Sequence, residues 1–226
     1  MKKQSWIIFF IIILTVHLAG IGLKMKLAEH FSKPMIVVLL ILYFLSQTNN
    51  IKSGLKKWIL AALFFSWAGD ILLMFQQNNS LFFLTGLSAF LIAHIFYIIF
   101  FHLVRVKEKV HLNVWLLLIV LIYYISLITF LSSHLGNMKL PVIIYGIVIS
   151  CMFMLAMHML FTKNKRAGNW MMSGALLFVI SDSVLAVNKF YQSFEMAGVI
   201  IMLTYGLAQL FIVEGAIKYI VSIDEE

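Results

Sequence analysis

The sequence has little charge and almost no cysteine. Only 12% of its 226 residues are Asp, Glu, Lys or Arg, whereas a soluble globular domain carries roughly 25%. The single cysteine, Cys151, rules out an internal disulfide and a paired-cysteine metal site. The chain also lacks a phosphate-binding loop and a GxSxG nucleophile elbow. These absences remove the common sequence signatures of soluble nucleotide-binding proteins and serine hydrolases.

Apolar residues are abundant instead, and they occur in long continuous runs. They make up 63% of the chain, and the mean hydropathy is +1.02. About 20 consecutive apolar residues are enough for a helix to cross a bilayer, and unbroken runs favour helices over the alternating strands of a barrel. We therefore predict an all-α polytopic membrane protein, one integral membrane domain over residues 1–226. The eight expected spans are 6–23, 34–47, 58–75, 80–104, 114–131, 141–161, 170–187 and 196–220.

The positive charge of the chain predicts its orientation. The net charge is +8, but the basic residues lie in short loops between the spans, which favours lipid headgroups over nucleic acid as partners. With the N-terminus inside, 12 Lys and Arg residues, Lys2 among them, fall on the inner side and 5 on the outer side. We predict a multi-pass protein of the cell membrane with both termini cytoplasmic. The first 20 residues imitate a secretory signal peptide, but the helix number requires that they remain as the first span.

The sequence also indicates an internal duplication, with halves of approximately 1–110 and 111–226. Each half carries a proline that opens its second span, an aspartate in its third span, and His or Gln in its fourth. These residues are Pro34, Asp70 and His94 in the first half, and Pro141, Asp182 and Gln209 in the second. Two units of four helices are parallel and related by an axis along the membrane normal. Such an axis predicts that the two aspartates lie at one depth, on opposite sides of a central cavity.

The two intramembrane aspartates are the best candidates for catalysis. Asp70 and Asp182 each lie 12 residues after a tryptophan, Trp58 and Trp170. An acid near the centre of a membrane helix costs roughly 2.5–3.5 kcal/mol on insertion and is functional by default. Facing carboxyls in a low dielectric do not both ionise easily, so we expect them to share a proton and act as acid and base. The alternative is a structural pair capped by Ser and Tyr hydroxyls.

Polar residues on the fourth and eighth spans are candidates for substrate binding. Tyr97 follows His94 by three residues and shares its helix face, and Tyr205 precedes Gln209 by four. We expect these two stripes to face the substrate. The alternative for His94 is a hydrogen bond between two helices, which is common for a single membrane histidine.

Two further candidates are placed by their spacing from the aspartates. Ser66 precedes Asp70 by four residues and lies on the same helix face. Lys189 follows Asp182 by seven residues, two turns toward the outside. We expect Lys189 to bind an anionic headgroup; a snorkelling anchor is the alternative.

We expect no cofactor and no metal. A metal site is conceivable if the fold brings four side chains together. Its ligands would be His17, Asp70, His94 and Asp182. No paired-histidine spacing supports it.

Five segments carry a family resemblance: KPMIVVLLIL, SWAGDILLMF, FFLTGLSAFLIAHIFYIIF, GALLFVISDSVLAVNKF and YGLAQLFIVEGA. With these segments in this order, the sequence resembles the YhhN family, the lysoplasmalogenases. The resemblance implies eight helices and a lysophospholipid substrate in the membrane. It implies hydrolysis of the vinyl ether bond of lysoplasmalogens to a fatty aldehyde and a glycerophospho-alcohol. It also points to Asn188, beside Lys189, as a substrate-binding residue.

Two other classes of function stay open at this point. A duplicated bundle with acids near the midplane is also how proton-coupled transporters are built. Gly69, beside Asp70, is the one hint of a broken helix of the kind that such transporters use. The second class is a membrane protein that binds lipid without turnover. Product formation distinguishes an enzyme from both.

Overall fold

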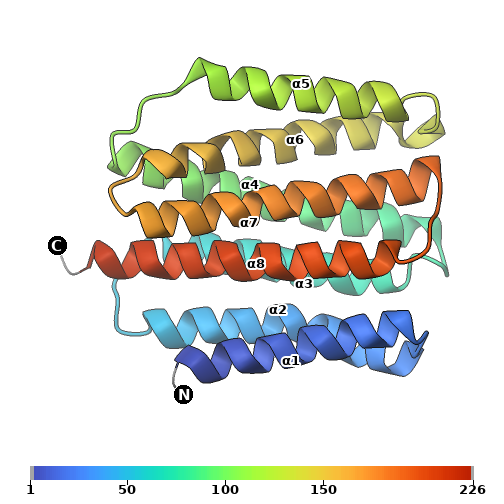
Figure 1. Ribbon diagram of the computed structural model, residues 1–226, viewed down its shortest axis with the longest axis horizontal. Helices are drawn as coiled ribbons and strands as arrows, with labels where there is room; N and C mark the ends of the chain where they lie inside the picture. The colour runs from blue at the N-terminus through green and yellow to red at the C-terminus, as the bar shows by residue number, and fades with distance from the viewer. Residues whose placement is uncertain (1–2, 225–226) are drawn as a thin grey trace.

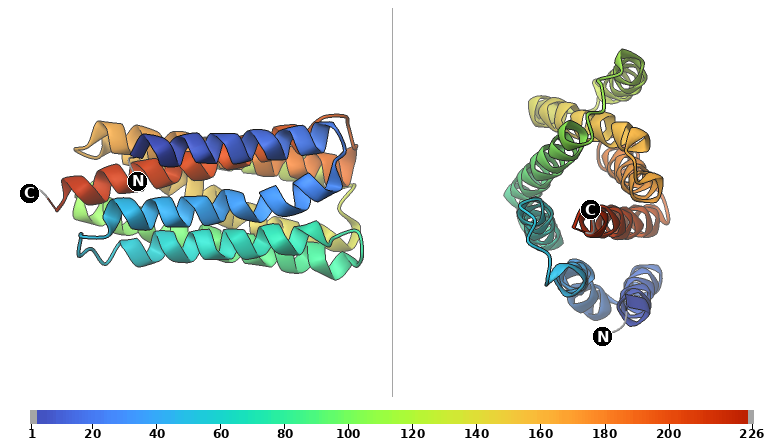
Figure 2. Two further views of the ribbon diagram at one scale, coloured as in Figure 1. Left: turned by 90° about the horizontal axis from the view of Figure 1, so that it is seen from below. Right: turned by 90° about the vertical axis from the view of Figure 1, so that its left-hand side faces the viewer.

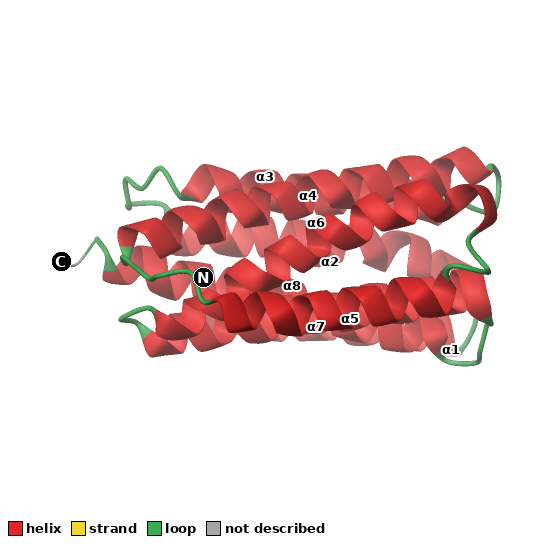
Figure 3. Ribbon diagram, turned by 90° about the horizontal axis from the view of Figure 1, so that it is seen from above, coloured by secondary structure: helices red, strands yellow, loops and turns green. Residues whose placement is uncertain are grey.

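The computed structural model describes residues 3–224 and, over that range, contains only helices, turns and loops (Figures 1 and 3). Lys2, which was counted among the inner basic residues, lies outside the described residues. Eight helices are long and apolar enough to cross a membrane, which confirms the predicted fold class. They are α1 (Lys3–Gly22), α2 (Lys26–Thr48), α3 (Lys56–Met74), α4 (Ser80–Lys107), α5 (Val114–Leu131), α6 (Lys139–His158), α7 (Lys165–Ala186) and α8 (Ala197–Ser222). Short helical turns cover Gly136–Met138, Met159–Phe161 and Val187–Tyr191, and the last of these is π-helical.

Asparagine side chains mark the starts of three helices. Asn79, Asn113 and Asn164 precede α4, α5 and α7, and each side-chain oxygen accepts a hydrogen bond from a backbone N–H of the first turn. Asparagine is among the most favourable N-cap residues because it satisfies an amide that has no partner within the helix. The capping residues therefore fix these starts locally, before any packing.

The expected start of the second span is wrong. The sequence predicted that Pro34 opens the helix, but α2 begins eight residues earlier, at Lys26, and Pro34 lies inside it. Proline only removes one donor from the helix ladder, and membrane helices tolerate this where neighbouring groups satisfy the freed carbonyl. Lys33 therefore belongs to a helix rather than to an outer loop. Pro141, by contrast, lies in the first turn of α6 as expected.

The helices form a ring with one helix outside it, as the end view in Figure 2 shows. α8 is the most buried helix and packs on α7, α2, α1 and α3. α5 is the least buried and packs mainly on α6, so most of its apolar surface faces outward. α3 and α7 lie on opposite sides of the end view and are not packed on one another.

Helix pairing follows the same order in both halves. α1 to α4 pack consecutively, and so do α5 to α8; the halves meet where α4 packs on α6 and α8 packs on α2. This order is what a duplicated four-helix unit would give. The internal duplication itself stays a prediction.

Glycines allow the closest helix contacts. A Cβ added at Gly174 of α7 would lie 2.7 Å from the carbonyl oxygen of Ala208 on α8. A Cβ added at Gly69 of α3 would lie 2.7 Å from the ring of Phe90 and 3.2 Å from the carbonyl oxygen of Gly86, both on α4. Small residues let membrane helices approach closely. Gly69 is therefore a packing residue in a continuous helix, and it holds Asp70 near α4.

Both chain ends lie at one end of the bundle (Figure 1). Near this end, the buried Glu214 of α8 accepts hydrogen bonds from Lys3 Nζ of α1 at 2.6 Å and from the hydroxyl of Tyr43 of α2. A buried carboxylate needs such partners. These contacts tie α1 and α2 to α8 and close the ring on that side.

Candidate functional site

A polar cluster surrounds Asp182, and we call its three residues, Asp182, Tyr145 and His94, the Asp182 cluster. The Tyr145 hydroxyl donates to Asp182 Oδ2 at 2.5 Å. His94 Nε2 lies 3.0 Å from the Tyr145 hydroxyl oxygen and 3.4 Å from Asp182 Oδ2. The three side chains come from α7, α6 and α4, so packing of these helices assembles the cluster. The His94 side chain is fully buried, and the Asp182 side chain keeps 16% of its surface exposed.

Asp182 reaches a small cavity whose other walls are almost wholly apolar. The cavity has a volume of about 40 Å³ and lies between α4, α6 and the end of α7. Its lining comprises Phe83, Leu87, Val142, Tyr145, Asp182, Leu185, Ala186 and Phe190. The only side-chain oxygens in this lining belong to Asp182 and Tyr145. The site therefore presents a carboxyl group to an apolar space.

Lys189 lies at the rim of this cavity. The π-helical turn Val187–Tyr191 places its amine 4.7 Å from the ring centroid of Phe83, which lines the cavity. The same amine donates to Gln76 Oε1 at 3.4 Å. π-helical turns within helices occur often at functional sites. The turn therefore places a cation beside Phe83, one of the residues that line the cavity.

A second polar cluster surrounds Asp70, and we call its three residues, Asp70, Lys33 and Tyr205, the Asp70 cluster. The Tyr205 hydroxyl donates to Asp70 Oδ2 at 2.7 Å, and Lys33 Nζ lies 3.9 Å from Asp70 Oδ1. Asp70 is only 2% exposed. The hydroxyl of Ser66, one turn before Asp70, is buried and has no hydrogen-bond partner among the described residues. Buried polar atoms normally have a partner, so this hydroxyl is available to a small polar molecule.

The two clusters are separate. The Phe178 ring contacts His94 at 4.7 Å and Tyr205 at 5.5 Å between ring centroids, and Phe90 contacts Tyr205 at 5.7 Å. No hydrogen bond joins Asp70 to Asp182. The structure therefore does not form the proton-sharing pair that the sequence led us to expect. The Phe178 ring instead contacts His94 and Tyr205, one partner of each aspartate.

The clusters are nevertheless built alike. Asp70 takes its partners from α2 and α8, and Asp182 takes its partners from α6 and α4. Each aspartate thus contacts the second helix of its own half and the last helix of the other half. This is the relation that a duplication predicts.

The other predicted site residues make structural contacts. The Tyr97 hydroxyl donates to Gln209 Oε1 at 2.5 Å, and both residues are fully buried between α4 and α8. Asn188 Oδ1 accepts from the backbone N–H of Phe194 at 3.3 Å and so fixes the loop before α8. His17 lies against Ser32, 2.8 Å between Nδ1 and Oγ. Within residues 3–224, no three His, Cys, Asp or Glu side chains come close enough to hold a metal ion.

The sequence reasoning missed two residues of the clusters. Tyr145 lies in an apolar run and was not selected as a candidate. Its position one turn after Pro141 is the one feature of the sequence that could have drawn attention to it. Lys33 was assigned to an outer loop because Pro34 was expected to begin the helix. A helix extended upstream of Pro34 would have placed Lys33 on a bundle helix.

The comparisons with known proteins assign the family. A model of the YhhN family matches residues 28–216. The chain belongs to the YhhN family. No solved structure matches it.

Among the similar proteins are enzymes from mammals and bacteria. This chain is 34% identical over 168 residues to lysoplasmalogenase TMEM86B of Homo sapiens, and 32% identical over 167 residues to the Mus musculus protein of the same name. Each alignment covers 73% of this chain and 66% of the relative. A lysoplasmalogenase of Mycobacterium tuberculosis (strain CDC 1551 / Oshkosh) is 28% identical over 163 residues, which cover 71% of this chain and 60% of that protein. The matched part of this YhhN protein thus spans slightly less than two thirds of each relative.

Proposed function

We propose that this protein is a membrane-embedded hydrolase that cleaves the vinyl ether bond of lysoplasmalogens. The products are a fatty aldehyde and a glycerophospho-alcohol. The observation that carries the proposal is the position of Asp182, a carboxyl group in the wall of an apolar cavity with Lys189 at the rim. An apolar cavity suits the alkenyl chain, and a cation suits the phosphate. The names of the mammalian and bacterial relatives support the same chemistry.

The reaction needs proton transfer and one water molecule. A proton adds to the vinyl carbon that is not bonded to oxygen, and the neighbouring carbon becomes part of an oxocarbenium ion. Water adds to that carbon and loses a proton, which gives a hemiacetal. The hemiacetal hydroxyl then gives up its proton as its carbon becomes the aldehyde. The bond to the glycerol oxygen breaks, and that oxygen takes a proton to become the alcohol. A carboxyl group can donate the first proton, and a carboxylate can accept the proton from water.

In this proposal the two clusters have different roles. Asp182 faces the cavity and donates the proton, while Tyr145 and His94 hold its carboxyl group in position. Asp70, with Lys33 and Tyr205, accepts the proton from water. The unpartnered hydroxyl of Ser66 can position that water.

Substrate entry requires movement of side chains. A cavity of about 40 Å³ has room for little more than one water molecule. An alkenyl chain therefore enters only when cavity residues such as Phe83 and Phe190 move apart. The rings of Phe90 and Phe178 must also shift before one substrate can reach both aspartates. Lys189 then remains at the rim as the ligand of the phosphate.

The test of the function is turnover of two matched lipids by the purified protein. We expect aldehyde release from a 1-alkenyl lysophospholipid and none from its alkyl-ether analogue, which has no double bond to protonate. Mass spectrometry of the lipids before and after incubation measures the reaction. Lipid that is retained with unchanged mass would instead indicate a binding protein. Proton-coupled uptake into liposomes without product would indicate a transporter.

We also propose that both termini face the cytoplasm. Support comes from the split of 12 and 5 basic residues between the two sides and from the placement of both chain ends at one end of the bundle. Reporter fusions at Gln77, in the loop between α3 and α4, and at the C-terminus are expected to report opposite sides, with the C-terminal fusion inside. Reports from the same side would contradict the topology.

A further inference from the structure

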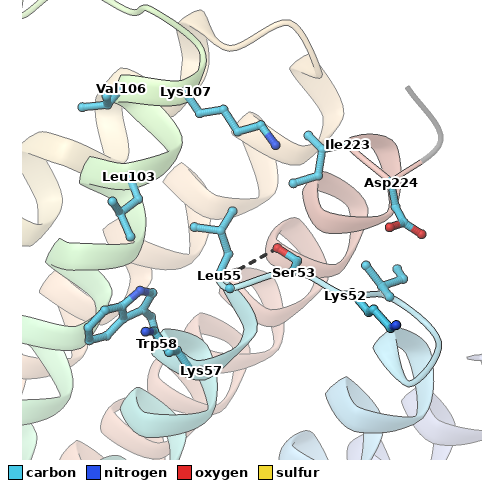
Figure 4. A pocket seen from close by; sticks show the side chains of 12 residues that line it. Lys52, Ser53, Leu55, Lys57, Trp58, Leu103, Val106, Lys107, Ile223 and Asp224 are labelled. Atoms are coloured by element: carbon cyan, nitrogen blue, oxygen red, sulfur yellow. Dashed lines mark hydrogen bonds between the residues drawn. The ribbon is translucent and has the colours of Figure 1, made fainter.

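A second and much larger cavity lies at the end of the bundle that holds the chain termini. Its volume is about 620 Å³, which is within the usual range of roughly 300–1,000 Å³ for small-ligand sites. The loop between α2 and α3, the last turns of α4 and the end of α8 form its walls (Figure 4). We call it the terminal pocket. The Asp182 cavity lies nearer the opposite end, at the start of α4 and α6.

Three lysines line the terminal pocket, and each comes from a different segment. They are Lys52 in the loop before α3, Lys57 in α3 and Lys107 at the end of α4; among the described lining residues, Asp224 is the single acid. In Figure 4 the Lys107 amine extends toward Ile223 on the opposite wall. Within residues 3–224, none of the three amines has a hydrogen bond or an ion pair, although the Lys57 amine lies 4.8 Å from the Trp58 ring centroid. Charges of one sign that line a concave wall attract an ion of the opposite sign.

The wall between α2 and α3, which carries Lys52 and Lys57, is held in place by its own hydrogen bonds. Lys56 Nζ donates to the carbonyl oxygens of Thr48 at 2.5 Å and Ile51 at 3.1 Å. The Ser53 hydroxyl oxygen accepts from the Leu55 N–H at 3.3 Å, so its own hydrogen remains free to donate. α3 begins at Lys56, and the start of a helix carries a partial positive charge. The described lining therefore carries three lysines and one acid, and hydrogen bonds order the loop that bears Lys52.

The rest of the pocket is apolar, and this indicates the class of ligand. Leu103 and Val106 of α4 and Ile223 after α8 line it together with the indole of Trp58. Tryptophan is enriched at membrane–water interfaces, and lysines there attract anionic headgroups. A ligand with a phosphate group and a glycerol or acyl portion matches both kinds of wall.

We propose that the terminal pocket binds the phosphate group of an anionic phospholipid, at a site separate from the candidate active site. A free organophosphate presents the same phosphate, so the experiment must compare the two sources. The proposal does not depend on the vinyl ether reaction. It requires only that the three lysines act together on one anion.

The test measures lipid binding to the purified full-length protein in detergent micelles. The probes are phosphatidylglycerol, phosphatidylcholine and free glycerol 3-phosphate. We expect phosphatidylglycerol to bind more tightly than phosphatidylcholine and to raise the melting temperature. The pocket variant Lys52→Gln/Lys57→Gln/Lys107→Gln is expected to weaken phosphatidylglycerol binding about tenfold or more, since each lysine near an anionic surface contributes substantially.

A matched variant removes three exposed basic residues at the opposite end of the bundle, at the starts of α2 and α6. This control is Lys24→Gln/Lys26→Gln/Lys139→Gln, and binding by it should stay within about twofold of the unchanged protein, because exposed charges far from a site are screened. Equal weakening in both triple variants would mean general surface attraction and would overturn the proposal. Equal binding of glycerol 3-phosphate and phosphatidylglycerol would support the phosphate site but assign it to a soluble ligand.

A single substitution tests the site without removing any lysine. Asp224→Asn removes the one acid among the described lining residues and is expected to tighten phosphatidylglycerol binding severalfold, because it removes a repulsion between like charges. This variant keeps the proposal testable if the triple pocket variant does not fold. An unchanged dissociation constant for the folded triple pocket variant would overturn the proposal; if that variant does not fold, an unchanged dissociation constant for Asp224→Asn would overturn it alone.

Discussion

Replacing Asp182 by Asn is expected to reduce aldehyde release from a lysoplasmalogen by about 100-fold or more. Asparagine keeps the shape of the side chain and can still hydrogen-bond to Tyr145, but it does not donate a proton at neutral pH. General acid–base catalysis typically contributes 10²–10⁴-fold. Asp70→Asn should cause a loss of similar size, since the proposal assigns the base to Asp70. Steady-state assays of the purified variants measure both effects.

The control for this prediction is an acid at the same end of the bundle that contacts neither cluster. Glu195 is exposed in the loop before α8, and Glu195→Gln should leave turnover nearly unchanged. Melting temperatures of all three variants show whether each one folds. If the folded Asp182→Asn variant keeps turnover within about tenfold of the original, Asp182 is not the proton donor.

Replacing Lys33 by Met is expected to cost stability, because it leaves the Asp70 carboxylate buried without its cation. Removing one partner of a buried ion pair typically costs about 3–5 kcal/mol. We expect a value near the lower end, since the Lys33 side chain is 16% exposed and lies 3.9 Å from Asp70. Unfolding of the purified protein in detergent, followed by heat or denaturant, measures the change in free energy.

The double variant Lys33→Met/Asp70→Asn distinguishes the ion pair from simple packing. It removes both charges, so it should be more stable than Lys33→Met alone. Lys139→Met is the matched control, because Lys139 is an exposed lysine whose amine has no hydrogen bond or ion pair within residues 3–224; its effect should be within about 0.5 kcal/mol. Strictly additive effects of Lys33→Met and Asp70→Asn would show that the two side chains do not interact in the folded protein.

Hydropathy alone predicted the eight helices, and the reason is physical. Backbone amides and carbonyls within a bilayer must pair with one another because no water is present there. In a long continuous apolar run, a helix satisfies all of these groups within the segment. The predicted start agrees with the structure after two of the three capping asparagines, Asn79 and Asn113. After Asn164 it does not, because the span was predicted from residue 170 and α7 begins at Lys165. Pro34 shows where such reasoning fails. A proline signals a helix start in many proteins, but a membrane helix can also contain one.

The candidate site, like the fold, was predicted from the sequence only in part. The sequence by itself singled out Asp70, Asp182 and His94 as candidates, because a polar group in an apolar run is costly and so stands out in a single chain. It did not predict which partner each aspartate takes. Tyr145 reaches Asp182 across 37 positions of sequence, and Tyr205 reaches Asp70 across 135.

Only the tertiary structure decided that the two aspartates form separate clusters. Hydrophobicity determines which segments enter the membrane, but it does not determine which faces of two helices pack together. That choice depends on close packing, for example at Gly69 against Phe90 and at Gly174 against Ala208, and on aromatic side chains such as Phe178, which contacts one partner of each aspartate. The composition and spacing of this chain therefore determined a helical membrane protein with buried acids. The packing of α4, α6, α7 and α8 determined how those acids are arranged.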